Sequence, residues 1–188
     1  CWNLAAAGRR VWGLAVRLEP GSSSRRLYYA VWNGPGTSTA WDALPDAEKR
    51  GSVWSVGLAP DGAFVAGDVR REFLLPDFFA KPEDVARAGY ASPVADIAFD
   101  DCSSKPVMLV SERGGQRNLG LGVVEAFAWP HEARTLRYEM DQGGGWRPVG
   151  RYDVGFYDRR KQGIPHLRAN AAGGAAFGYG YKADFSEI

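Results

Sequence analysis

The sequence predicts an all-β fold made of short antiparallel strands and tight turns. Its 188 residues include 24 Gly and 11 Pro, together with 7 Trp, 8 Tyr and 9 Phe. Glycine and proline favour turns, whereas aromatic side chains favour the pleated surface of a sheet. A strand-like pattern also recurs along the chain at an almost constant spacing. A chain of this length buries a core of its own, so we expect residues 1–188 to form one domain.

The recurring pattern is a six-residue strand that begins with valine. It is VWGLAV at 11–16, VWSVGL at 53–58 and VADIAF at 94–99, so the copies begin 42 and 41 residues apart. The fifth residue of each copy is small, which lets crowded backbones approach closely. These small residues are Ala15, Gly57 and Ala98. A chance recurrence in a valine-rich β protein is the alternative explanation.

Each copy is followed by a turn and a second strand, at 25–32, 62–69 and 105–112. The middle turn, APDGA, carries the Pro-Asp-Gly sequence of a hairpin. Further on, 135–140 and 146–154 form a hairpin across DQGGG, which we interpret as the outer strands of the third unit.

The remaining segments are predicted to open a further unit or to form insertions. Residues 165–181 would open a fourth unit, with Leu167 and Ala169 on its inner strand, and 120–134 would be an insertion before it. Capping residues, early acids and closing glycines predict short helices within 38–51 and 81–89.

A period near 41 residues with paired strands is typical of β-propeller blades. The repeats over 11–115 resemble those of the broad NHL-like and WD40-like propeller families, although the Gly-His and Trp-Asp signatures of WD40 repeats are absent. The resemblance implies an all-β propeller of about four blades with short helical insertions. These blades would form either a compact ring or part of a larger ring, which further sequence or another chain, including a second copy, would complete.

Charge and cysteine content restrict the partners and the compartment. The 23 basic and 22 acidic residues give a net charge of +1, which provides no strong field for nucleic acid. No run of 18 apolar residues predicts a transmembrane segment. Cys1 and Cys102 could form a disulfide, Cys1 could carry a lipid, or both could be free thiols. The first two options indicate an extracellular, periplasmic or cell-surface location.

The stretch SERGGQRNLG at 111–120 is the most chemically suggestive part of the sequence. It places Glu112, Arg113, Arg117 and Asn118 on one loop, and it resembles the TERPG and HRNPQG segments of quinone-dependent sugar dehydrogenases. Gln116 and Leu119 depart from that family's histidine and proline. The resemblance implies a ligand-binding loop formed by the four residues.

A second resemblance is to calcium-dependent lactonase propellers, which hold a metal at the channel mouth. Asp96, Glu112 and Asn170 come from more than one predicted blade and supply the oxygen ligands that Ca²⁺ prefers. A metal site at His131 and His166 would need both residues to converge with carboxylates.

We therefore predict a non-catalytic binding or scaffold domain for a protein or glycan partner, without a cofactor. Arginines and aromatic residues of turns and insertions would form its surface. The alternative is a propeller enzyme, calcium-dependent or quinone-dependent, that acts on a small sugar or lactone. The aromatic residues concerned are Trp32, Trp41, Trp129, Trp146, Phe156 and Tyr157.

Overall fold

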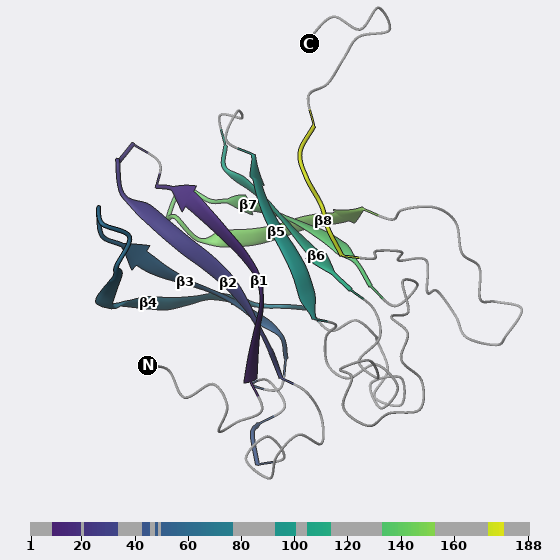
Figure 1. Ribbon diagram of the computed structural model, residues 1–188. Helices are drawn as coiled ribbons and strands as arrows, with labels where there is room; N and C mark the ends of the chain where they lie inside the picture. The colour runs from purple at the N-terminus through teal and green to yellow at the C-terminus, as the bar shows by residue number, and fades with distance from the viewer. Residues whose placement is uncertain are drawn as a thin grey trace, which may run out of the picture.

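The described part of the chain forms two antiparallel four-stranded sheets (Figure 1). The computed structural model describes residues 9–19, 21–33, 43–45, 48, 50–76, 93–100, 105–113, 133–152 and 173–178. Sheet A consists of β1 (Arg9–Leu18), β2 (Arg25–Asn33), β3 (Ser52–Leu58) and β4 (Phe64–Leu74). Sheet B consists of β5 (Val94–Asp100), β6 (Val107–Glu112), β7 (Thr135–Met140) and β8 (Trp146–Tyr152). In both sheets, strands that are consecutive in the sequence are neighbours.

The all-β prediction is confirmed for the described residues, which include eight of the predicted strands, but the proposed assignment of strands to blades is partly wrong. The strand beginning at Val11 and the strand beginning at Val53 belong to one sheet, because β2 pairs with β3 from Arg25↔Leu58 to Val31↔Ser52. The 41-residue repeat is therefore a hairpin, and two hairpins make a sheet. A lone hairpin is only marginally stable in water, which explains why the hairpins join. The hairpin formed by β7 and β8 does supply the outer strands of sheet B.

The structure tests only one of the two predicted helical insertions, and that one in part. The insertion at 38–51 is described only in part, and its described residues contain no α-helix. The insertion at 81–89 lies outside the described residues, as does most of 120–134. Within the described ranges, no helix is long and apolar enough to cross a membrane.

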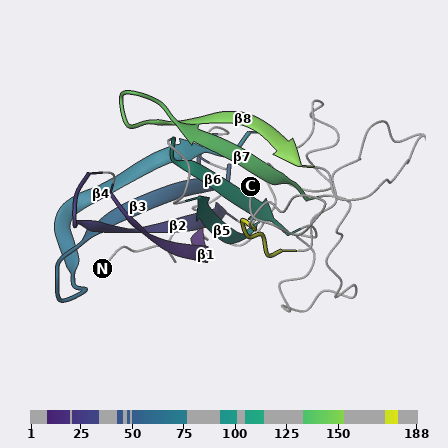
Figure 2. The same cartoon turned by 90° about the horizontal axis from the view of Figure 1, so that it is seen from above.

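The two sheets face each other across a shared apolar core, with sheet B lying over one face of sheet A (Figure 2). Tyr28 and Val53 of sheet A and Met108 and Tyr138 of sheet B are almost completely buried there. The ring of Phe73 stacks on that of Tyr138, with centroids 4.0 Å apart. We call the face of sheet A that contacts sheet B its inner face and the opposite face its outer face.

Two tryptophans that were predicted to lie on an aromatic surface are buried instead. Trp32 lies within β2 and is 2% exposed, and Trp146 begins β8 and is 7% exposed. The Trp146 ring packs in the core with its centroid 6.2 Å from that of the Tyr28 ring. The Arg17 guanidinium lies 5.7 Å from the centroid of the Trp146 ring. A large aromatic ring at the end of a strand buries more apolar area in the core than it would over a turn, so burial in the core is more stabilising. The other four residues of the predicted surface lie outside the described residues.

A close approach of backbones occurs at Gly13, which is not one of the three small residues for which it was predicted. A Cβ atom at Gly13 would lie 2.9 Å from the backbone nitrogen of Asp96 and 3.0 Å from the carbonyl carbon of Ala95. Edge strand β1 therefore touches β5 directly. At Gly57 the space is taken by the side chain of Asp68, whose carboxylate accepts a 2.8 Å hydrogen bond from Arg26.

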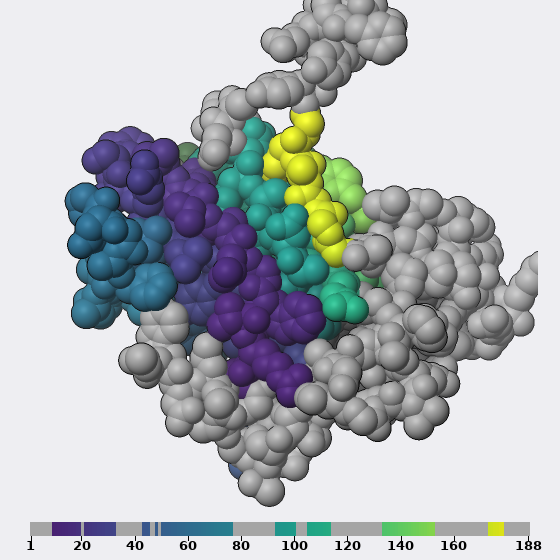
Figure 3. All heavy atoms as spheres, viewed as in Figure 1, coloured from purple at the N-terminus to yellow at the C-terminus, as the bar shows by residue number. Residues whose placement is uncertain are grey.

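The segment 173–178 lies on the other side of β5. The backbone nitrogen of Ala175 donates a 3.0 Å hydrogen bond to Asp96 Oδ2, and a Cβ at Gly173 would lie 3.5 Å from that of Ala95. Figure 3 shows β1, β5 and 173–178 as adjacent purple, teal and yellow strips. We call this arrangement the strand row. The segment falls within the predicted fourth unit, although Leu167 and Ala169 lie outside the described residues.

Gly13→Ala should destabilise the protein by about 1–3 kcal/mol, because the added methyl group would force β1 away from β5. Urea denaturation measures the effect. Gly150→Ala is the matched control, since a Cβ at that strand position would meet no atom within 4 Å. Equal stabilities for the two variants would contradict the close contact at Gly13.

Candidate interaction surface

The structure describes three of the six predicted ligand-binding residues. Asp96 lies in β5, Glu112 ends β6, and Arg113 follows Glu112 directly. The other three lie outside the described residues, as do both histidines and both cysteines. They are Arg117, Asn118 and Asn170.

Glu112 is completely buried and bonded to Arg134. Arg134 Nε donates to Glu112 Oε2 and Arg134 Nη2 to Glu112 Oε1, both at 2.7 Å, and the backbone nitrogen of Arg134 donates to Oε2 at 3.1 Å. Arg134 Nη2 also donates to the carbonyl of Pro76, just beyond β4, at 2.9 Å. This buried pair therefore ties sheet B to the end of sheet A.

The electrostatics of Glu112 are those of a structural ion pair. Burial raises the pKa of the Glu112 carboxyl, and the hydrogen bonds and charge of Arg134 oppose that rise. Arg134 comes from the end of the stretch that we interpreted as an insertion, so sequence reasoning missed it as the partner. A carboxylate followed about twenty residues later by an arginine has no distinctive spacing that could have revealed the pair.

Asp96 and Arg113 also make contacts within the protein. Asp96 holds the segment 173–178 through the backbone of Ala175. The Arg113 guanidinium lies 5.7 Å from the centre of the Trp12 ring, and its backbone nitrogen donates to Pro93 O. Arg113 therefore links sheet B to β1, as a cation packed on an aromatic face.

The predicted carboxylates do not converge on one point. In the β5–β6 register Asp96 is opposite Ser111, whereas Glu112 is opposite Val94, so the two carboxylates lie on different faces of sheet B. Among the described residues no group of three His, Cys, Asp or Glu side chains could hold a metal ion. Asn170, the third member of the proposed calcium site, lies outside the described residues, so its part in that site stays a prediction.

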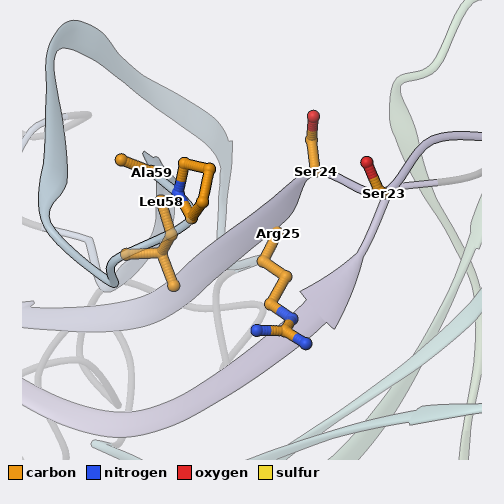
Figure 4. A pocket seen from close by; sticks show the side chains of 6 residues that line it. Ser23, Ser24, Arg25, Leu58 and Ala59 are labelled. Carbon is orange, nitrogen blue, oxygen red and sulfur yellow. The ribbon is translucent and has the colours of Figure 1, made fainter.

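A small pocket of about 310 Å³ lies at one end of sheet A (Figure 4). The β1–β2 turn contributes Ser23 and Ser24, and the start of the β3–β4 turn contributes Ala59 and Pro60. In Figure 4 the Arg25 side chain points away from the two serine hydroxyls. Because its polar groups do not converge, the pocket lacks the usual character of a small-molecule site.

The outer face of sheet A carries the more distinctive feature, a row of aliphatic side chains along edge strand β1. Each is between 43% and 56% exposed. The β1–β2 register places three of them opposite Val31, Tyr29 and Leu27, so the row continues an apolar face whose centre is buried. We call this row the β1 stripe. It consists of Val11, Leu14, Val16 and Leu18.

Sequence reasoning missed the β1 stripe although the sequence contained an indication of it. The segment VWGLAV is apolar at almost every position, and such strands are usually covered on both faces. The structure covers one face of β1, where Trp12 and Ala15 pack against the core. The other face presents the β1 stripe.

Comparisons of the chain with protein-family models, with curated proteins and with solved structures found no match.

Glu112→Gln should destabilise the protein by about 3–5 kcal/mol, because the buried Arg134 cation would lose its counter-charge. Thermal or urea denaturation measures the loss. Glu112→Leu combined with Arg134→Leu should cost less than the single variant, since no unpaired charge would remain. A Glu112→Gln variant as stable as the parent protein would contradict the structural role of the pair.

Proposed function

We propose that this chain is a non-catalytic scaffold module that binds a protein partner through the β1 stripe. The observation that carries the proposal is the run of four aliphatic side chains, each more than two-fifths exposed, on one edge strand. Scattered apolar side chains are normal on a surface, but a contiguous apolar strand face is typical of a protein interface.

A protein partner fits the stripe better than a glycan does. Sugar rings are usually bound by aromatic faces together with polar groups, whereas Val11, Leu14, Val16 and Leu18 offer only aliphatic contact. The buried centre of the same face, which includes Tyr29 and Val56, gives the stripe a rigid support. Such support lowers the conformational cost of binding.

We further propose that sheets A and B are neighbouring blades of a propeller-like array. In support, each sheet is a four-stranded meander whose first strand touches the first strand of the other. The segment 173–178 then occupies the next place in the strand row, beside β5. This order of first strands is the order expected of strands that line a propeller axis.

The enzyme alternative receives less support from the described residues. The Glu112 carboxylate is bonded to Arg134, and Asp96 holds the backbone of Ala175. The remaining residues of both proposed enzyme sites, Arg117, Asn118 and Asn170, lie outside the described part of the chain. No specific observation therefore favours a calcium-dependent or quinone-dependent activity over binding.

Val16→Lys should abolish partner binding, because a lysine ammonium would have to lose its water in an apolar contact. We expect capture of the partner from an extract of the source cells to fall by about tenfold or more, which corresponds to about 1.4 kcal/mol. Quantitative mass spectrometry of the captured proteins measures the change.

Val149→Lys is the matched control, since Val149 is also an exposed valine, 42% exposed, but lies in β8 of sheet B. It should leave capture unchanged. If both variants bind the same proteins as the parent chain, or if the parent chain binds none, the proposed function is wrong.

A further inference from the structure

The strand row has two free ends among the described residues. Its order is β1, then β5, then 173–178, which is not itself a β-strand. The backbone of β1 meets the backbone of β5 at Gly13, and 173–178 meets β5 through the side chains of Asp96 and Ala95. At one end β1 presents the β1 stripe. At the other end 173–178 presents an exposed edge on which Phe177 is 38% exposed.

The end formed by 173–178 has the chemistry needed to pack on an apolar strand. Its sequence is GGAAFG, and Gly174, Ala176 and Gly178 are exposed together with Phe177. Small residues let a neighbouring backbone approach closely, as Gly13 does where β1 meets β5. One large ring among them supplies the apolar area that such a contact buries.

We infer that the β1 stripe of one molecule binds the 173–178 end of a second copy of this chain. The inference rests on the proposed function and names its partner. The contact would extend the order of the strand row, in which β5 lies beside β1 and 173–178 lies beside β5. Continuity with these internal contacts, rather than apolar exposure alone, identifies the occupant.

Two further properties agree with a second copy. The net charge of +1 produces little repulsion between identical molecules. The two ends differ in shape, because one carries branched aliphatic side chains and the other glycine, alanine and one phenylalanine. A contact between unlike ends is head-to-tail, so it produces a closed ring or an open polymer rather than a twofold dimer.

Analytical ultracentrifugation of the purified chain tests the inference, with Cys1 and Cys102 replaced by serine to prevent disulfide exchange. The parent chain should form species larger than 20.5 kDa as its concentration rises. Val16→Lys and Phe177→Lys should each remain at the monomer mass, whereas Val149→Lys should associate like the parent chain. Leu14→Lys replaces Val16→Lys if circular dichroism shows that the latter does not fold.

An equimolar mixture of Val16→Lys and Phe177→Lys provides the sharper test. Each variant keeps one intact end, so the mixture should form a dimer that grows no further. A mixture that stays monomeric would overturn the head-to-tail contact. Association that Val16→Lys abolishes but Phe177→Lys leaves intact would also overturn it, because the stripes would then bind each other.

A parent chain that is monomeric at every concentration would overturn the inference without deciding the proposed function. If Val16→Lys, but not Val149→Lys, then prevented the capture of a different protein, the proposed binding function of the β1 stripe would still hold. Loss of both self-association and stripe-dependent capture would overturn the two proposals together.

Discussion

The constraint on which this structure depends is that sheet A carries an apolar cluster on each of its two faces. Its inner face is buried against sheet B through Tyr28 and Val53. On its outer face, Tyr29, Val31 and Val56 form a second buried cluster. A sheet with two apolar faces is stable in water only when both are covered, because exposed apolar area costs about 25 cal/mol per Å². Among the described residues, this requirement is unmet along the β1 stripe and at Phe64 of β4, and the proposed binding role follows from the stripe.

Buried polar contacts fix how the two sheets meet. The Glu112–Arg134 pair reaches the carbonyl of Pro76, so one charged pair joins β6, the residues before β7 and the end of β4. A buried ion pair adds little net stability, but it penalises any arrangement that separates its members. Within sheet A, Arg26 of β2 donates to the partly exposed Asp68 of β4 and so links two strands of the same sheet. The Glu112–Arg134 contact with Pro76 therefore specifies one arrangement of two sheets that could otherwise slide past each other.

The sequence allowed the strands to be predicted but not the way in which they associate. Alternating and continuous apolar runs, with turns such as APDGA and DQGGG, located all eight strands. The pairing of β2 with β3 was not predicted. The spacing of about 41 residues between hairpins in the sequence is the same whether two hairpins join in one sheet or form separate sheets. Glu112 was predicted to bind a ligand because nothing local indicates that an arginine 22 residues away meets it. Trp146 was placed on the surface because it follows a turn, whereas its ring enters the core.

The most direct test of the account is radical footprinting of β1 in the protein purified with its partners from the source cells. The account predicts that Leu14 and Val16 are modified much less in this assembly than in the dilute isolated chain. Val149, which lies on the other sheet, should be modified equally in both and serves as the internal reference. Equal modification of Leu14 and Val16 in the two preparations would mean that no partner covers the stripe, and it would contradict the central claim.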